Sequence, residues 1–150
     1  MGIFDIFKSK TKTNAPPPAG DKNTARLGRI VGDRMAQTYD RMDAIDALAK
    51  LSSKESVTAL LKRFTFYSDP SMVDQQEKES AFVSVVEMGE IAIEPVVAFC
   101  EKADSLTWPL KILTELLEPD GFLEAALDLL DARDTDYTRN VVRNMEARLA

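Results

Sequence analysis

The chain has 150 residues, 45% of them hydrophobic, which suffices for one globular domain with a sizeable core. Its 25 acidic and 19 basic residues give a net charge of -6, which disfavours nucleic acid as a partner because binding phosphate requires a basic surface. With no histidine and a single cysteine, Cys100, the sequence excludes an intrachain disulfide, a Cys/His zinc site and most catalytic triads.

The charge is divided unevenly along the chain. Residues 1–40 contain seven basic and four acidic residues, a net of +3, whereas residues 41–150 contain 12 and 21, a net of -9. No apolar stretch reaches the roughly 18–20 residues that a membrane-spanning helix requires. The opening residues MGIFDIF lack the basic leader and the cleavage site of a secretory signal. We therefore expect a cytoplasmic protein of bacterial type.

Residues 1–22 are expected to form a flexible, disordered tail. Three consecutive prolines at 16–18, within a stretch of Lys, Ser, Thr, Asn, Ala and Gly, indicate an extended linker. Before the linker, a short apolar segment within residues 1–7 would present one hydrophobic face if helical. Its apolar side chains are Ile3, Phe4, Ile6 and Phe7.

This segment predicts a tether, because apolar residues beside a basic linker suit either an anionic membrane surface or a groove in a partner protein. The alternative is a disordered start with incidental apolar residues. N-myristoylation at Gly2 is disfavoured, since Ile6 stands where the acylation pattern requires Ser or Thr.

Residues 23–150 are expected to form one all-α domain. Apolar residues recur there every three or four positions, the helical period, and alternating strand patterns are scarce. About eight helices with short connections are predicted. They span residues 24–39, 40–51, 52–67, 74–89, 91–103, 107–117, 119–132 and 135–150.

Several helix ends carry local signals. Thr24 and Asp40 are the expected N-caps of the first two helices, and Ser52 with Glu55 spells a capping box for the third, in preference to Ser53. Gly89 is expected to end the fourth helix at its C′ position. Pro109 is expected in the first turn of a helix, where its missing N–H costs nothing.

The apolar pattern repeats as two-helix units. Shifts of 37 and then 28 residues superpose the first helix of each unit. Those positions are Ala44, Ile45, Leu48 and Leu51; Ala81, Phe82, Val85 and Met88; and Pro109, Leu110, Leu113 and Leu116. The second helices align at Val57, Leu60, Leu61 and Phe64; Ile93, Val96, Val97 and Cys100; and Leu123, Ala126, Leu127 and Leu130. One hairpin cannot bury its apolar faces alone, so tandem units predict a stacked array.

The segment DRMDAIDALAKLSSKESVTALLKRF resembles a HEAT-type repeat of the short bacterial kind, and GEIAIEPVVAFC is similar to the turn and second helix of such a repeat. The resemblance covers roughly residues 38–132, and its third unit departs from the pattern at Pro109. It implies an armadillo-like α-solenoid of about three to four hairpins. It further implies a concave surface, lined by the second helices, that binds other proteins.

Acidic residues cluster at 74–79 and 131–136, but neither cluster has the central glycine of a calcium loop. We expect Asp74 and Glu77 to be solvent-exposed at a helix start, where they favour the helix dipole. Cys100 lies in an apolar run and is expected to be a small core residue. The sequence therefore predicts no catalytic residue, no metal site and no cofactor.

Candidate binding residues follow the best repeat. In KRFTFYSDP, residues 62–70, Phe64 belongs to the repeat frame and should be core, whereas two further aromatic residues lie beyond it. Aromatic side chains and arginine commonly anchor interfaces. The candidate partner-binding residues are therefore Arg63, Phe66, Tyr67, Trp108 and Lys111. The alternative is that these rings pack the loops between repeats.

Taken together, these patterns predict a non-enzymatic adaptor that binds a protein or peptide through its repeat surface, in the cytoplasm or peripherally at the inner face of the membrane. The resemblance leaves two alternatives. One is a relative of HEAT-like chromophore lyases, for which the chain offers no catalytic set. The other is a nucleic-acid binder of the HEAT-like glycosylase kind, against which the net charge of residues 41–150 argues.

Overall fold

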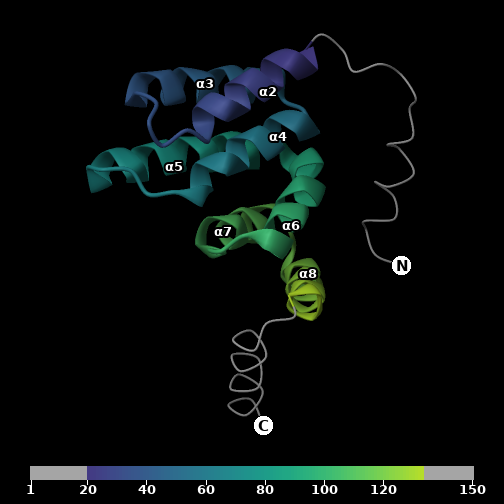
Figure 1. Cartoon of the computed structure of the whole chain (residues 1–150). Coiled ribbons are helices and arrows are strands. Elements are labelled where there is room, and N and C mark those ends of the chain that lie inside the picture. The colour runs from purple at the N-terminus through teal and green to yellow at the C-terminus, as the bar shows by residue number, and fades with distance from the viewer. Residues whose placement is uncertain (1–19, 134–150) are drawn as a thin grey trace.

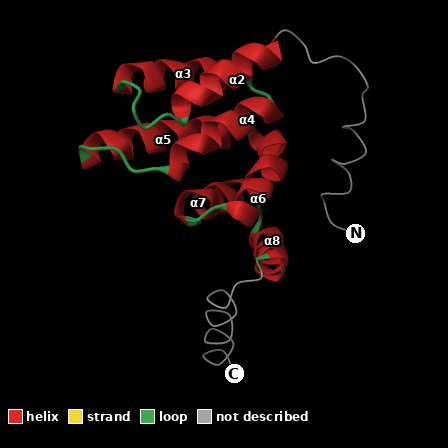
Figure 2. Cartoon of the chain, in the orientation of Figure 1, coloured by secondary structure: helices red, strands yellow, loops and turns green. Residues whose placement is uncertain are grey.

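The computed structural model describes residues 20–133, and this part of the chain is all-helical with no strand (Figure 2). Residues 1–19 of the predicted tail and the predicted helix at 135–150 lie outside the described residues, whereas residues 20–22, also predicted to belong to the tail, are helical. The helices are α2 (Gly20–Val31), α3 (Thr38–Leu51), α4 (Lys54–Leu61), α5 (Ser71–Glu87), α6 (Ile93–Lys102), α7 (Thr107–Leu116) and α8 (Pro119–Ala132). Two short 3₁₀ turns, η1 (Lys62–Thr65) and η2 (Gly89–Ala92), continue α4 and lead into α6.

The helices form two rows. Helices α2, α4, α6 and α8 contact one another in that order, and α3, α5 and α7 form a second row beside them. Consecutive helices join the rows, so the molecule is a stack with the α2–α3 pair at one end and α8 at the other (Figure 1). None of the described helices is long and apolar enough to cross a membrane.

The core runs between the two rows. Its fully buried members come from nearly every helix, including Val31 of α2, Ile45 of α3, Leu60 of α4, Val85 of α5 and Ile112 of α7. Each recurs with its neighbours at three- or four-residue spacing, so one stripe of every helix turns inward. The predicted core positions Phe64 and Cys100 are buried as well. Burial raises the pKa of the Cys100 thiol to about 11, which keeps it protonated and inert at neutral pH.

The signals at helix ends are confirmed at two sites. Gly89 follows the last residues of α5 with a φ of +70°, the left-handed conformation that glycine adopts without strain. Pro109 lies in the first turn of α7, as its missing N–H allows. The positions of Gly89 and Pro109 could be predicted because the backbone constraints of glycine and proline are local.

Three predicted caps are wrong. Helix α2 begins at Gly20 and α3 at Thr38, so Thr24 and Asp40 lie inside helices and cap neither. The capping box of α4 is Ser53 with Ser56: each side-chain oxygen accepts the other residue's N–H, at 3.0 and 2.8 Å. Ser52 ends α3 in the left-handed conformation, at φ 45°, and therefore lacks the extended backbone that an N-cap needs.

The predicted core positions agree with burial in the first two units except at Leu51, which is 41% exposed, and they are off by one residue in the second helix of the third unit. On α8 the buried residues are Ala125 and Leu129, whereas the predicted Leu123 and Leu127 are 58% and 52% exposed. The stretch from 122 to 130 is apolar at so many positions that two neighbouring faces were equally plausible from sequence. Packing of α8 on α6 selects the face that is one residue earlier.

Candidate functional site

Four charged side chains are buried where α3, η1 and α5 meet. Glu77 accepts two hydrogen bonds from Arg41, at 2.9 and 3.0 Å, and one from Nε of Arg63 at 2.6 Å. Asp74 accepts from Nη2 of Arg63 at 2.7 Å and from Lys78 at 2.8 Å. We call Arg41, Arg63, Asp74 and Glu77 the buried charge network. No member exposes more than 6% of its surface, so each charge is compensated by its partners rather than by water.

The expectation that Asp74 and Glu77 are solvent-exposed is wrong. Three residues apart on α5, they share one helical face, and that face is turned toward two arginines from other elements. Among the described residues, no buried side-chain nitrogen or oxygen is left without a hydrogen-bond partner. Every buried nitrogen and oxygen of the network therefore has a hydrogen-bond partner, and the network holds the surrounding helices and loops together.

The network also fixes two loops. Arg41 donates to the carbonyls of Asp33 and Ala36 in the loop between α2 and α3, and to Oγ of Ser68 in the loop before α5. In that second loop, Arg63 donates to the carbonyl of Phe66 at 3.0 Å. One guanidinium, Arg41, thus holds residues 32–37 and residues 66–70 side by side at the same edge of the stack.

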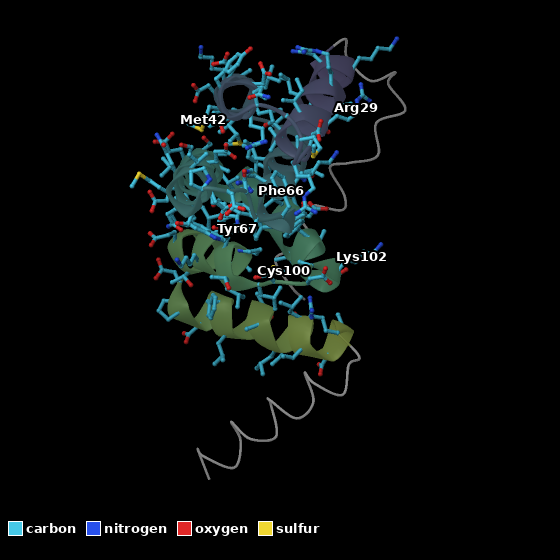
Figure 3. The ribbon with its side chains drawn as sticks, turned by 60° about the vertical axis from the view of Figure 1, so that its left-hand side comes forward. Arg29, Met42, Phe66, Tyr67, Cys100 and Lys102 are labelled. Carbon is cyan, nitrogen blue, oxygen red and sulfur yellow. The ribbon has the colours of Figure 1, made fainter. Side chains whose placement is uncertain are left out.

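Phe66 covers this network. Its ring centroid lies 4.2 Å from the guanidinium carbon of Arg63 and 5.6 Å from that of Arg41, a cation–π arrangement with both. The ring is half-buried. In Figure 3, Phe66 and Tyr67 lie in the part of the stack between Met42 and Cys100.

Around the network, large apolar side chains remain exposed. Met35 (81% exposed) lies in the first loop and Tyr67 (52%) in the second, while Tyr39 (67%) and Met72 (80%) lie in the first turns of α3 and α5. We call Met35, Tyr39, Tyr67 and Met72 the loop-edge surface. Because Ala36 and Ser68, the neighbours of Met35 and Tyr67, bind the same guanidinium, the two loops form one continuous edge.

The structure divides the predicted binding residues into two groups. Phe66 and Tyr67 lie at the loop edge, but Arg63 is fully buried, with its guanidinium in the charge network. Trp108 and Lys111 lie on α7, where the Trp108 ring stacks on Phe64 at 5.7 Å and Lys111 lies 4.6 Å above it. Trp108 thus packs on aromatic rings of η1 and α5, Phe64 and Phe82.

Sequence reasoning did not identify Met35, Tyr39 or Met72 as candidates. In the sequence, a methionine or tyrosine near a helix start looks like an ordinary core or turn residue. These residues become a candidate surface only because they are exposed and the two loops are adjacent. Arg41 was equally hidden, because an arginine in a helix is exposed by default. No local signal marks this network, because Arg41 and Arg63 lie 36 and 14 residues from Glu77 in the sequence.

Within residues 20–133, acidic and cysteine side chains nowhere gather in the threes that a metal ion would require. A shallow hollow of about 340 Å³ lies between η1 and the end of α6, with Phe64 and Phe99 in its wall and Lys102 and Asp104 at its rim.

The pKa of the Asp74 carboxyl is lowered. Burial alone would raise this pKa, but hydrogen bonds from Lys78, Arg63 and the backbone N–H of Ser68 stabilise the carboxylate more strongly. A lowered folded-state pKa contributes stability above the unfolded value of about 3.9, and this contribution is lost as the pH falls through the folded-state value.

We therefore expect Asp74→Asn to lower the free energy of unfolding by about 1–3 kcal/mol at neutral pH and to flatten its decline below about pH 4. Urea unfolding at several pH values, followed by Trp108 fluorescence, measures both effects. Asp43→Asn, at an exposed position of α3, is the control and should keep the wild-type pH profile. An unchanged profile for Asp74→Asn would show that its ion pairs do not persist in solution.

Comparison of the chain with protein-family models, with curated proteins and with solved structures gives no match.

Proposed function

We propose that the chain is a non-enzymatic, HEAT-like scaffold that binds a protein or peptide partner at the loop-edge surface. The two rows of helices support the solenoid arrangement, since stacked hairpins place first and second helices in separate rows. The observation that carries the binding role is that four Met and Tyr side chains are exposed on the two loops that Arg41 joins and on the helix turns that follow these loops.

The chemistry of this edge suits recognition. Methionine adapts to irregular apolar surfaces, and tyrosine supplies a large contact with little loss of side-chain entropy. The loops that carry them are held by the buried charge network, so the backbone is ordered before a partner arrives and binding costs less entropy.

The charged residues near the loop-edge surface indicate what kind of partner it would bind. Three exposed acids, Asp33 and Asp69 in the two loops and Asp43 on α3, outnumber the one exposed arginine of these loops, Arg34. A segment with apolar anchors flanked by lysine or arginine would satisfy both the Met and Tyr contacts and these carboxylates. We therefore expect a basic, apolar peptide segment as the ligand class. The predicted tether residues Ile3, Phe4, Ile6 and Phe7 lie outside the described residues and would add a second contact.

The test compares two triple variants of the full chain in affinity capture from a lysate. Met35→Ser, Tyr67→Ser and Met72→Ser together remove most of the loop-edge surface. Leu51→Ser, Val83→Ser and Leu127→Ser remove three exposed apolar side chains elsewhere and are the matched control.

We expect the loop-edge variant to lose wild-type partners at least about tenfold while the control retains them, since interface anchors contribute about 2 kcal/mol or more. Circular dichroism must show both variants folded. Equal partner recovery by the two variants would refute the proposed surface. Removing residues 1–20 in a third sample measures what the tail contributes.

A further inference from the structure

Three loops cross from the row of α2, α4 and α6 to the row of α3, α5 and α7. They are residues 32–37 between α2 and α3, residues 66–70 between η1 and α5, and residues 103–106 between α6 and α7. We call them the inter-unit loops. Figure 2 shows all three, drawn green, on the same side of the stack. They therefore follow one another along that side, one loop for each layer of the stack.

Contacts between the layers hold neighbouring inter-unit loops together. Arg41 donates to the carbonyl of Ala36 in the first loop and to Oγ of Ser68 in the second. An aromatic contact joins the second loop to the third, because Phe64, two residues before the second loop, stacks on Trp108, two residues after the third, at 5.7 Å. The three loops thus form one edge.

Each inter-unit loop exposes one aspartate. In chain order these are Asp33, Asp69 and Asp104. Two exposed basic residues lie nearby, Arg34 in the first loop and Lys102 just before the third, where the exposed Glu101 precedes it. The second loop contains no basic residue. Exposed acids therefore outnumber exposed bases along this edge, and a carboxylate recurs once in every layer.

Each inter-unit loop also offers an apolar contact near its aspartate. Met35 is exposed in the first loop and Tyr67 in the second. At the third loop the apolar contact is the hollow of about 340 Å³, which has Phe64 and Phe99 in its wall and Asp104 at its rim. One carboxylate and one apolar contact thus recur together at all three loops.

The distance between layers sets the distance between these contacts. Helices α2, α4 and α6 contact one another in that order, and packed helices lie about 8–10 Å apart. A polyproline II segment rises about 3.1 Å per residue and makes one turn in three residues, so every third side chain lies on one face, about 9 Å from the last. A chain in this conformation would place equivalent side chains at consecutive loops.

We propose that the inter-unit loops bind one segment of a partner protein in polyproline II conformation, in which an apolar and a basic residue recur every three positions. Its apolar residues contact the exposed side chains of the first two loops and enter the hollow at the third. Its basic residues pair with the three aspartates. This inference rests on the proposed function and adds the conformation of the ligand, its period and a third contact site.

The test is fluorescence anisotropy of the full chain with two labelled peptides of the same composition. One consists of three tandem Leu-Lys-Pro triplets, and the other has the leucines, lysines and prolines grouped in three blocks. The charge variant is Asp33→Asn, Asp69→Asn and Asp104→Asn together. The hollow variant is Ala98→Phe, because Ala98 lies in the wall of the hollow and a larger side chain there fills it.

Matched controls make the same kinds of change elsewhere. Asp46→Asn, Asp128→Asn and Asp131→Asn together remove three exposed carboxylates from α3 and α8. Ala25→Phe fills a second hollow, of about 360 Å³, between α2 and α4. Circular dichroism checks that every variant folds.

We expect the wild type to bind the triplet peptide at least about tenfold more tightly than the block peptide. The charge variant and the hollow variant should each weaken triplet binding at least about fivefold, and the controls should stay within about twofold of wild type. Unchanged binding by the hollow variant overturns the third contact site.

The remaining outcomes separate this proposal from the proposed function. Equal affinity for the two peptides overturns the three-residue period. Equal losses in the charge variant and its control overturn the aspartate contacts in favour of net charge. Binding of neither peptide overturns the inference as a whole. In each of these cases the loop-edge surface is still decided independently, by partner capture with its own triple variant.

Discussion

Replacing Glu77 with alanine is expected to lower the free energy of unfolding by about 3–5 kcal/mol, a large part of the total stability of a domain of this size. The carboxylate of Glu77 is shared by Arg41 and Arg63, which bind it at 2.6–3.0 Å. Its removal leaves two guanidinium groups facing one remaining buried carboxylate, Asp74. The cost is that of an uncompensated buried charge rather than of one lost contact.

Two controls separate charge from packing. Glu77→Gln keeps the size and one acceptor oxygen but not the charge, so an intermediate loss is expected. Glu87→Ala, at an exposed position on the same helix, should change stability by no more than about 0.5 kcal/mol. Chemical denaturation followed by far-ultraviolet circular dichroism measures all three. A loss below about 1 kcal/mol for Glu77→Ala would mean that water or a shifted side chain replaces the carboxylate.

The same network explains why the helices were predictable and this site was not. Helix periodicity, Gly89 and Pro109 depend on residues within one or two turns, and so they can be read from sequence. The Arg41–Glu77 pair joins residues 36 apart, and Arg63–Glu77 joins residues 14 apart across a loop. Nothing in the sequence near Glu77 distinguishes it from a solvent-exposed helix acid, because its burial is decided by the arginines of other elements.

The loop-edge surface could not be predicted from the sequence either, because it too depends on contacts between distant residues. Met35 and Met72 are exposed although large apolar residues are usually buried. One exposed apolar residue by itself does not indicate a binding site. Their significance comes from adjacency, which depends on Arg41 holding the two loops together. The predicted Tyr67 lies at this edge because it belongs to the loop that Arg41 and Arg63 hold. Trp108 and Lys111, predicted by residue type alone, lie on a different helix.

Replacing Trp108 with alanine is expected to lower the free energy of unfolding by about 2–4 kcal/mol. The ring stacks on Phe64 and meets Phe82 edge-on at 5.9 Å, joining α7 to the end of α4 and to α5. Deleting it removes both aromatic contacts and opens a cavity between α7, α5 and the end of α4. Tyr67→Ala is the matched comparison, because Tyr67 is half exposed and its loss should cost about 1 kcal/mol or less.

Both variants are measured by circular dichroism during urea unfolding, since Trp108 is the one tryptophan in the chain and its fluorescence is lost with it. Lys111→Ala tests whether the cation above the ring contributes, with an expected change of no more than about 1 kcal/mol. If Trp108→Ala proves as stable as Tyr67→Ala, the ring does not hold α7 to α4 and α5, and partner binding becomes the better explanation of its role. The comparison of the two variants thus separates a structural role of Trp108 in packing from a surface role of Tyr67 in binding.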